Sequence, residues 1–517
     1  MKTERVKNSS YNVISNVIIL LLTTVLTFVT RTIFIRYLGK VMLGLDGLFV
    51  NIISMLSLAE LGLGTSIHFF LYKPLATGDK KRIGIIMSLL KRVYLIISAI
   101  ILLVGLIITP FIHFFVNGYS GNQLYIIYFL YLINSVVTYL LSYKESLIIA
   151  NQKDYKLFWI KLITIILLYG SQIFVLITLR SFIAYLIALI VSNIFRYLSS
   201  SIYTQKLYKD IDFNSKEKLD EKTIEEVKTN VKSLMVSRVG DYLLNGTDNI
   251  ILSAINIVLT GIYSNYLAIV GIMKTFMNVI YNGITASFGN VIAIEESHVK
   301  KNVFNISSFV CFVISGFIAV ELCFLFNPFI KIWAGKSYVA DYWISIVIAL
   351  NFYFYSQTLT LNNLKNASGS YKADRMVPLI QAAVNLAVSI ALGIKMGLGG
   401  VVLGTLVSYL TVGMIFRPIL LIKKVLNCSS RQYFMMQLKY IITLLIVFIA
   451  NYLLFKYINL DNSILLIVLK GFIVMVTYFI LISIIYFKNK EFKYVIELLK
   501  NGFNNFVVKK KKLNTSN

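Results

Sequence analysis

Charged residues are scarce in this sequence, and acidic residues are the scarcest. Only 14% of the 517 residues are charged while 58% are hydrophobic, and 23 Asp and Glu stand against 50 Lys and Arg. The apolar residues gather in blocks of about 20 rather than in amphipathic stripes, which excludes a soluble fold. Backbone amides in hydrocarbon must be bonded internally, so blocks without period-2 alternation predict membrane-spanning helices.

Several motifs that carry chemistry are missing. The three cysteines are scattered without a CxxC pair, which predicts neither disulfides nor a thiolate metal site. His68, His113 and His298 lie far apart and form no HExxH pattern, so no metal site is expected. No GxxxxGK[ST] loop occurs, so nucleotide hydrolysis by this chain is not expected. We predict no cofactor, and any uphill transport would draw on a proton or sodium gradient or on substrate supply.

The net charge of +27 is spread along the whole chain. Nucleic-acid-binding proteins cluster their basic residues on one folded face, whereas here Lys and Arg recur in every second loop, as the positive-inside rule describes. With the N-terminus assigned to the cytoplasm, about 40 of the 50 Lys and Arg fall in cytoplasmic segments and about 7 in outer loops. This bias predicts a multi-pass cell-membrane protein with both termini cytoplasmic and no nucleic-acid partner.

Apolar blocks between charged or Gly, Pro and Asn breaks predict an all-α polytopic protein of about 14 transmembrane helices. The N-terminal block has no small-residue cleavage site after it and is predicted to be a retained span. The expected spans are roughly 12–35, 46–70, 90–116, 124–148, 157–179, 181–201, 234–256, 261–287, 303–326, 340–361, 376–396, 399–422, 436–455 and 463–486.

The spans are expected to form two six-helix bundles followed by two additional helices, because one sizeable polar loop separates the first six spans from the other eight. The basic C-terminal tail is predicted to lie on anionic lipids of the inner leaflet. The predicted parts are an N-terminal six-helix bundle at 1–202, a charged cytoplasmic linker at 203–232, a C-terminal six-helix bundle at 233–424, two additional helices at 425–487 and the tail at 488–517.

An internal repeat supports the division into bundles. A shift of 217 residues aligns about 30 positions without a gap, and the six intervening spans give both copies the same orientation. A parallel repeat predicts an axis along the membrane normal. The matches are Thr30 with Thr247, Ile33 with Ile250, Val41 with Val258, Gly44 with Gly261 and Ile52 with Ile269.

Ionisable residues inside apolar spans are costly and usually face a cavity or a partner. Glu60 and Lys274 lie near the midpoints of the second and eighth spans, and the repeat places Lys274 on Ser57, one helical turn from Glu60. Arg31 falls on Asp248 under the same shift. We predict that these four charged residues line a polar central cavity suited to a phosphate group and a hydroxyl-rich sugar chain. The alternative is a set of structural ion pairs that hold the bundles together.

Other acidic and basic residues give weaker signals. Asp241, Glu321 and Glu145 lie nearer the ends of spans, and Lys470 is expected to snorkel to the interface. Asp210-Ile-Asp212 has the spacing of a sugar-transferase metal motif, but a loop of about 30 residues offers no nucleotide-binding domain. We expect a solvated acidic pair that offsets Lys206 and Lys209.

Short motifs along nearly the whole chain resemble the polysaccharide-unit flippases (Wzx-type) of the multidrug, oligosaccharidyl-lipid and polysaccharide exporter superfamily. They are Arg36-Tyr-Leu-Gly39, Ala59-Glu-Leu-Gly-Leu-Gly64, Tyr72-Lys-Pro-Leu-Ala-Thr-Gly-Asp-Lys-Lys-Arg82, Tyr143-Lys-Glu145, Ala150-Asn-Gln-Lys153 and Thr247-Asp-Asn249. The resemblance implies a V-shaped pair of bundles that carries a polyprenyl-diphosphate-linked oligosaccharide outward by alternating access, with a polysaccharide polymerase and assembly proteins as partners. It also implies that basic cavity residues hold the diphosphate, a role that would fall on Arg31 and Lys274.

Three other functions are consistent with a polytopic chain of this kind. A peptidoglycan-precursor flippase of the same superfamily would have a similar helix count and an equally cationic cavity. A multidrug exporter usually stops at 12 spans, two fewer than expected here. A membrane-embedded polysaccharide polymerase or ligase would carry a large outer loop, whereas the outer loops here are expected to be short. The sequence therefore favours a transporter over an enzyme and does not name the sugar, the coupling ion or the oligomeric state.

Overall fold

The computed structural model describes most of the chain as two compact units. The first unit consists of Met1–Ser264 with Ile390–Val401, and the second of Asn265–Ser389 with Val402–Asn517. The predicted domain boundaries are not tested by this division and stay a prediction. The residues that the structure describes are 2–57, 63–217, 219–221, 225, 239–240, 242–244, 246–294, 297–368, 374–426, 429–456, 463–497 and 500.

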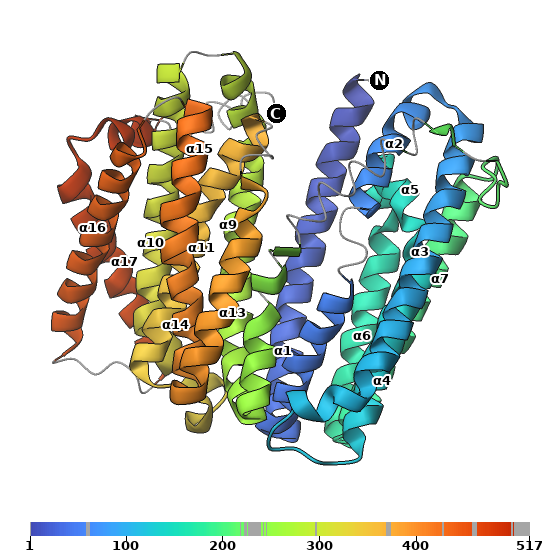
Figure 1. The fold of residues 1–517 in the computed structure, drawn as a ribbon, viewed down its shortest axis with the longest axis horizontal. Coiled ribbons are helices and arrows are strands. Elements are labelled where there is room, and N and C mark those ends of the chain that lie inside the picture. Colours follow the sequence, from blue (N-terminus) through green and yellow to red (C-terminus); the bar gives the residue numbers. More distant parts are fainter. Residues whose placement is uncertain are drawn as a thin grey trace, which may run out of the picture. The chain divides into compact units, whose positions relative to one another are not determined.

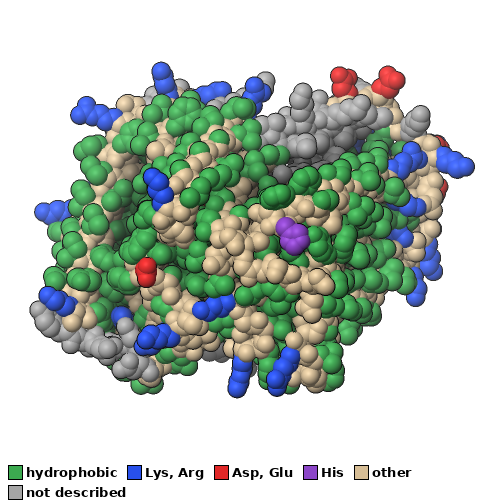
Figure 2. Space-filling view, turned by 60° about the horizontal axis from the view of Figure 1, so that its bottom comes forward, with side chains coloured by type: hydrophobic (Ala, Val, Ile, Leu, Met, Phe, Trp, Pro, Cys, Tyr) green, Lys and Arg blue, Asp and Glu red, His purple; other side chains and the backbone are tan. Residues whose placement is uncertain are grey.

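Within the described residues, 12 helices are long and apolar enough to cross a membrane. Hydrophobic side chains cover much of the face drawn in Figure 2, and many Lys and Arg side chains lie along its edges. The prediction of an all-α polytopic membrane protein is confirmed. The predicted count of 14 is not confirmed, because the first two predicted spans share the helix Ile14–Leu56 and the seventh, at 234–256, falls partly outside the described residues.

Helix α1 (Lys2–Leu56) is interrupted at Gly39, whose backbone has φ 74° and ψ −169°. A residue without a Cβ adopts this conformation at little cost. In a continuous helix Arg31 and Asp46 would lie about 22 Å apart, yet these two side chains interact electrostatically. The chain therefore turns back at Gly39, and α1 holds two apolar segments that bring Arg31 and Asp46 to a similar depth.

The remaining helices of the first unit run alongside one another (Figure 1). Helix α7 packs against both α4 and α6, while α3 packs on α4 and α1 on α6. The elements are α2 (Leu63–Thr77), α3 (Lys80–Ile108), the 3-10 helix η2 (Thr109–Phe115), α4 (Gln123–Ser142), α5 (Glu145–Ala150), the 3-10 helix η3 (Asp154–Leu157), α6 (Phe158–Thr178) and α7 (Phe182–Leu207). Helix α3 begins where the Asp79 carboxylate accepts a hydrogen bond from the backbone N–H of Arg82, so its first turn is capped.

The second unit is built around α11 (Tyr342–Ser368). In its most apolar stretch of 18 residues 83% of the residues are buried, against 22% in the corresponding stretches of α16 and α17. Helix α10 packs against both α11 and α17, so α16 and α17 lie on the outside of this unit (Figure 1). The other elements are α9 (Ile257–Ile294), which begins in the first unit, α10 (Ser297–Trp333), the 3-10 helix η4 (Lys336–Tyr338), α13 (Val377–Met396), α14 (Leu398–Ser408), the π-helix η5 (Tyr409–Phe416), α15 (Arg417–Leu426), α16 (Arg431–Phe455) and α17 (Ile464–Tyr486).

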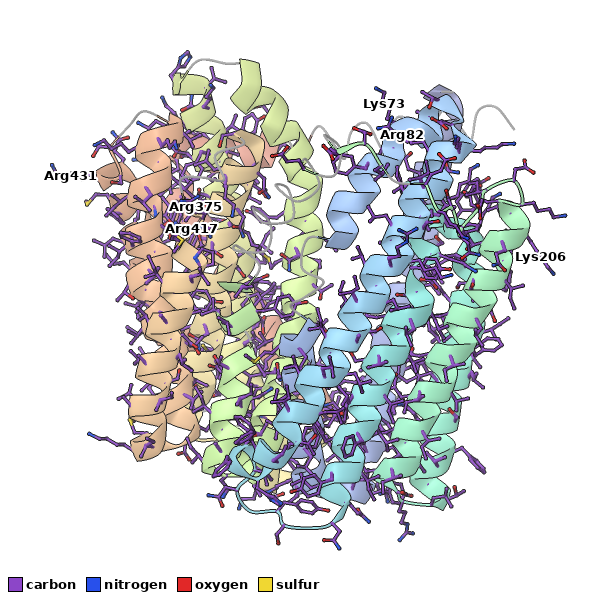
Figure 3. The ribbon with its side chains drawn as sticks, turned by 45° about the vertical axis from the view of Figure 1, so that its right-hand side comes forward. Lys73, Arg82, Lys206, Arg375, Arg417 and Arg431 are labelled. Carbon is purple, nitrogen blue, oxygen red and sulfur yellow. The ribbon has the colours of Figure 1, made fainter. Side chains whose placement is uncertain are left out.

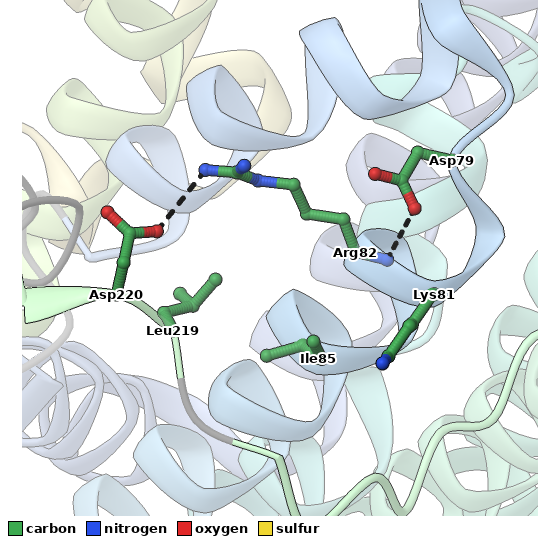
Figure 4. Close-up of a pocket in the computed structure, with 6 residues that line it drawn as sticks. All are labelled: Asp79, Lys81, Arg82, Ile85, Leu219 and Asp220. Atoms are coloured by element: carbon green, nitrogen blue, oxygen red, sulfur yellow. Dashed lines mark hydrogen bonds and ion pairs between the residues drawn. The ribbon is translucent and has the colours of Figure 1, made fainter.

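The first half of the linker packs on the polar end of α3, where Figure 3 labels Arg82 near Lys73 of α2. Ion pairs join Lys80 to Asp210 at 2.5 Å, Lys81 to Glu217 at 2.9 Å and Arg82 to Asp220 at 3.5 Å. Beneath them Ile211, Phe213 and Leu219 are buried. Asp79, Lys81, Arg82, Ile85, Leu219 and Asp220 line a small cavity of about 200 Å³ at this junction (Figure 4).

The docked linker corrects the expected partners of Asp210. Its carboxylate is 70% exposed, as predicted, but its ion pair is with Lys80 of α3. The hydrogen bond from Lys80 and the charge of Lys80 hold the pKa of Asp210 below its usual value, with a smaller contribution from Lys209. Gly84 permits the close approach, because a Cβ there would lie 2.7 Å from the backbone oxygen of Asp212. The linker therefore rests on α3 between Asp210 and Asp220 instead of being a purely solvated loop.

Candidate functional site

The four predicted site residues fall in different surroundings. Glu60 lies outside the described residues. Arg31 belongs to α1 and Asp248 to the segment before α9, both within the first unit, whereas Lys274 belongs to the part of α9 in the second unit. The predicted common cavity is therefore still a prediction, and each residue is described within its own unit.

Lys274 lies beside polar groups of α11. Its Nζ is 4.4 Å from the centre of the Tyr355 ring, a distance at which an ammonium group is attracted to the ring face. The Tyr355 hydroxyl and the Asn278 side-chain amide are hydrogen-bonded at 3.0 Å. Because Asn278 is one helical turn from Lys274, the cation, the amide and the phenol form one cluster between α9 and α11.

A second cluster surrounds Arg31 in the first unit. The Asp46 carboxylate interacts electrostatically with Arg31 and accepts a hydrogen bond from the Tyr131 hydroxyl of α4. Tyr185 of α7 interacts electrostatically with both Arg31 and Asp46. The sequence reasoning missed Asp46, because it was taken as the first residue of a span. Along the sequence Asp46 lies nearly as far after Gly39 as Arg31 lies before it. If the chain had been predicted to turn at Gly39, this spacing would have indicated that the two residues meet.

Asp248 is 5% exposed and accepts a hydrogen bond from the Tyr263 hydroxyl at 3.4 Å. The repeat shift of 217 places Arg31 on Asp248 and Asp46 on Tyr263. The two positions that interact in the first copy of the repeat therefore interact in the second copy as well. The residue types differ, since an Arg and Asp pair in the first copy becomes an Asp and Tyr pair in the second.

Glycines bring the two copies of the repeat into backbone contact. A Cβ on Gly44 would lie 2.2 Å from the backbone oxygen of Ile257, and a Cβ on Gly261 would lie 2.2 Å from the backbone oxygen of Lys40. The repeat pairs Gly44 with Gly261 and Lys40 with Ile257, so these two contacts are equivalent. A Cβ on Gly47 would meet the Ser264 hydroxyl at 2.7 Å, and these positions are also paired by the shift. The register of the predicted repeat is thus reproduced as a two-fold packing contact.

Buried charges elsewhere are mostly paired. Glu145 of α5 accepts hydrogen bonds from Arg196 at 3.1 Å and from Ser200 at 2.7 Å, both on α7. Lys161 of α6 forms an ion pair with Asp154 at 2.7 Å. A buried charge with a well-placed partner is tolerated, and its removal leaves an uncompensated charge. These pairs connect helices within the first unit and are structural.

An ion-pair cluster at one end of the second unit was also missed. Asp374 is 1% exposed and accepts hydrogen bonds from Arg417 Nε at 2.9 Å and Nη2 at 2.8 Å. Arg417 also donates to the Asn362 side chain at 2.7 Å, and Lys365 lies 3.7 Å from Asp374. Arg417, labelled in Figure 3, is buried and follows directly after the π-helix η5. The sequence analysis singled out none of these residues, and no local pattern indicates that they meet.

The described residues contain no group of three or more His, Cys, Asp or Glu side chains arranged to hold a metal ion. Cys311 and Cys323 are buried free thiols. The polar groups of the described helices are cations, amides, hydroxyls and carboxylates. Such groups bind and orient anionic or hydroxylated ligands.

Comparison with solved structures gives the class of fold. The chain matches an inward closed structure of the lipid II flippase MurJ with a TM-score of 0.63 at 18% identity, covering 91% of this chain and 98% of that one. It matches an inward-facing multidrug resistance MATE family transporter of the MOP superfamily with a TM-score of 0.63 at 12% identity, covering 79% and 96%. This chain therefore has the fold of MOP-superfamily transporters.

No family sequence model matches the chain, and no curated protein sequence matches it.

Proposed function

We propose that this chain is a flippase of the polysaccharide-unit (Wzx) type. It would move a polyprenyl-diphosphate-linked oligosaccharide across the cytoplasmic membrane by alternating access, for cell-surface or capsular polysaccharide synthesis. The observation that carries this proposal is the full-length fold similarity to a lipid II flippase, which covers 91% of this chain. The flippase motifs in the sequence favour the oligosaccharide substrate. No catalytic residues are proposed, because the function is transport and not catalysis.

The extent of the two fold matches favours a lipid-linked substrate over a drug. The match to the multidrug transporter covers 79% of this chain and the match to the lipid II flippase 91%. The difference is 12% of a 517-residue chain, about 60 residues, which is the size of the predicted pair of additional helices at 425–487. A lipid flippase with these extra helices accounts for the difference.

Lys274 is the residue we assign to the diphosphate. An ammonium group in a region poorly screened by water attracts phosphate strongly, and Asn278 and Tyr355 place an amide and a hydroxyl beside it. These neutral groups suit phosphate oxygens and sugar hydroxyls. Arg31, with Asp46 beside it, is assigned a supporting role in the same substrate path. Glu60 and Asp248 complete the proposed cavity.

A second candidate is a flippase for a peptidoglycan lipid precursor, since the protein named in the structural match is a lipid II flippase. Both candidates would use the same lipid carrier and a cationic site. A membrane-embedded polymerase is a weaker alternative. The partners proposed with the first function are anionic membrane lipids, a polysaccharide polymerase and assembly proteins. Energy would come from a proton or sodium gradient or from substrate supply.

Depletion of the protein tests the substrate class. Mass spectrometry of the lipid-linked intermediates that accumulate should show a polyprenyl-diphosphate oligosaccharide repeat unit. Accumulation of a peptidoglycan precursor alone would support the second candidate. Normal levels of both intermediates, with loss of drug resistance, would contradict a lipid-linked substrate.

The proposed location is the cell membrane with cytoplasmic termini. Single cysteines at Asn122 and Asn256 should react with an impermeant thiol reagent added outside intact cells, since these residues are exposed in loops opposite the linker in the predicted topology. Cysteines at Asp79 and Ser215 should not react. Labelling at Ser215 in intact cells would reverse the assigned orientation.

A further inference from the structure

Glu321 is an acidic residue inside an apolar helix pair of the second unit. It belongs to the candidate membrane span His298–Trp333 of α10. Its side chain is half-buried, and its Oε2 atom is buried without a hydrogen-bond partner. No ion pair or hydrogen bond joins the Glu321 carboxyl to another side chain in the described residues. Glu145 provides the contrast, because its buried carboxylate is bonded to both Arg196 and Ser200.

The carboxyl of Glu321 points at a glycine of the neighbouring helix. A Cβ on Gly471 of α17 would lie 3.5 Å from Oε2 of Glu321 and 3.2 Å from a methyl carbon of Leu325. Two turns further along α17, the Tyr478 hydroxyl donates to the backbone oxygen of Val313 at 3.0 Å. Helix α17 is thus fixed on α10 at two levels, and the absence of a side chain on Gly471 makes room for the carboxyl group.

Charged groups on the neighbouring helices α17, α16 and α11 have other contacts. On α17, Lys470 Nζ lies 5.1 Å from the centre of the Phe455 ring. On α16, Lys439 lies 4.8 Å from the Tyr486 ring. On α11, Lys365 lies 3.7 Å from Asp374. Tyr478, which also lies in this interface, donates to main-chain oxygens of α10. None of these groups forms an ion pair with Glu321.

We propose that Glu321 is a proton-binding site at the junction of α10 and α17. An ionised carboxylate in hydrocarbon with neither a counter-charge nor hydrogen-bond donors is unfavourable, so the packed helices hold the neutral acid. Release of the proton would require water to reach this carboxyl, whose Oε2 atom lies between α10 and α17. A metal ion is a poor occupant, because a hard cation needs several oxygen ligands and here one carboxyl oxygen faces a glycine. Proton binding here does not depend on which substrate the protein carries.

A hydrophobic carbodiimide tests this assignment in native membranes. The reagent reacts with a neutral carboxylic acid: the acid proton moves to one carbodiimide nitrogen while a carboxyl oxygen bonds to the central carbon. The acyl group then shifts to nitrogen and gives a stable N-acylurea, with no leaving group. Mass spectrometry after treatment with dicyclohexylcarbodiimide should find the adduct on Glu321. Adduct formation there should be at least roughly tenfold greater than on Glu145, whose carboxylate is already engaged in an ion pair with Arg196.

Control measurements distinguish a buried proton site from a cation site and from a carboxylate in contact with water. Glu321→Gln, which keeps the shape and neutrality of the acid, should insert normally and show no adduct at this position. Labelling of Glu321 should fall as the pH is raised, because the reagent requires the acid form. An unmodified Glu321, or equal modification of Glu321 and the cytoplasmic-tail residue Glu491 by a water-soluble carbodiimide, would overturn the proposal. So would protection of Glu321 by sodium ions at constant pH, since that result would indicate a cation site.

Discussion

The two copies of the repeat, 30–52 and 247–269, have the same backbone contact and different polar chemistry. Gly44 and Gly261 sit at equivalent positions and each meets a backbone oxygen of the other copy. In the first copy the polar pair is Arg31 with Asp46, and in the second it is Asp248 with Tyr263. Packing thus fixes the glycines, whereas the polar positions have diverged.

This difference indicates which property each position serves. A Cβ added at Gly44 or Gly261 would lie 2.2 Å from a backbone oxygen of the other copy. A backbone oxygen cannot move aside as a flexible side chain can, so these positions accept only glycine. A polar pair needs only complementary groups and so allows different residues in the two copies. The resulting asymmetry places a cation and a carboxylate in the first copy, and a carboxylate and a phenol in the second. An asymmetric pair of this kind suits a substrate with an anionic and a neutral polar part.

The largest expected effect comes from filling either glycine contact. Gly44→Val and Gly261→Val should each cost about 3 kcal/mol of stability or prevent insertion, because the new side chain would overlap a backbone oxygen. The two losses should be similar, since the contacts are equivalent. Melting temperatures in detergent measure both. If Gly44→Val were tolerated while Gly261→Val prevented folding, the two contacts would not be equivalent.

Gly271 supplies the matched control for these substitutions. It lies on the same α9 helix as Gly261, and nothing lies within 4 Å of an added Cβ. Gly271→Ala should leave stability unchanged or raise it by up to about 1 kcal/mol, because alanine favours helix more than glycine does. A large loss there would mean that glycine substitution in α9 is harmful for reasons unrelated to the contact between copies.

The next largest effect is expected at Lys274, which the repeat pairs with Ser57. Lys274→Ala should reduce transport at least roughly tenfold with near-normal insertion, because the diphosphate loses its cation. Lys274→Arg should retain part of the activity, since the charge persists in a different geometry. Ser57→Ala is the control and should transport normally. Uptake or flipping assays on matched amounts of inserted protein make the comparison.

A structural ion pair between Glu60 and Lys274 gives a different result. Each single charge removal would then lower protein stability, and the exchange Glu60→Lys with Lys274→Glu would restore both stability and transport. Under the transport role, Glu60→Gln should slow transport and weaken its dependence on the ion gradient, while the exchanged protein stays inactive. A stable and fully active Lys274→Ala protein would contradict both roles.

A smaller effect is expected from the polar pairs of the two copies. Asp46→Asn removes the charge that interacts with Arg31 and should cost about 2 kcal/mol, less than a fully buried pair because Asp46 is partly exposed. Asp248→Asn keeps an oxygen that accepts the Tyr263 hydroxyl and should cost less than about 1 kcal/mol. Thermal melting of the two variants tests the order. Equal losses of stability in the two variants would mean that the Arg31 and Asp46 pair contributes no more than the Asp248 and Tyr263 pair.

The smallest effect is expected in the linker that joins the two copies. The ion pairs of Lys80 and Asp210 and of Lys81 and Glu217 are more than half exposed, and salt should weaken them readily. Asp210→Asn or 1 M salt should raise the rate of proteolysis within 208–221 only severalfold. The pKa of Asp210 is lowered in the folded protein, so its contribution is present at neutral pH and is lost as the pH falls through that lowered value. Unchanged proteolysis in 1 M salt would show that the buried Ile211, Phe213 and Leu219 hold the linker without the ion pairs.

The sequence predicted the class of fold and the register of the repeat for physical reasons. Long apolar blocks leave few alternatives to helices in a membrane, and Gly44 and Gly261 must be small because backbones meet there. The pairing of Asp46 with Arg31 was not predicted, since it depends on the chain reversal at Gly39. The same holds for Asp374 and Arg417, which are 43 residues apart and meet only in the folded unit.

The linker and Glu321 show a second limit of sequence reasoning. Asp210 was assigned to nearby Lys206 and Lys209, because local charges are the only visible partners in a sequence, while its ion pair is with Lys80. Glu321 was ranked low for its place near the end of a predicted span. Its significance comes from an unbonded oxygen facing Gly471, which only the packing of α10 and α17 reveals.

Translocation in sealed proteoliposomes tests the central claim most directly. The purified protein would be reconstituted with a short polyprenyl-diphosphate oligosaccharide, and an impermeant sugar-modifying enzyme would report how much substrate changes leaflet. Wild-type protein is predicted to translocate the lipid-linked sugar, while Lys274→Ala at equal protein content should approach the rate of protein-free vesicles. Wild-type vesicles that match protein-free vesicles while moving a lipid II analogue or a cationic drug would contradict the account.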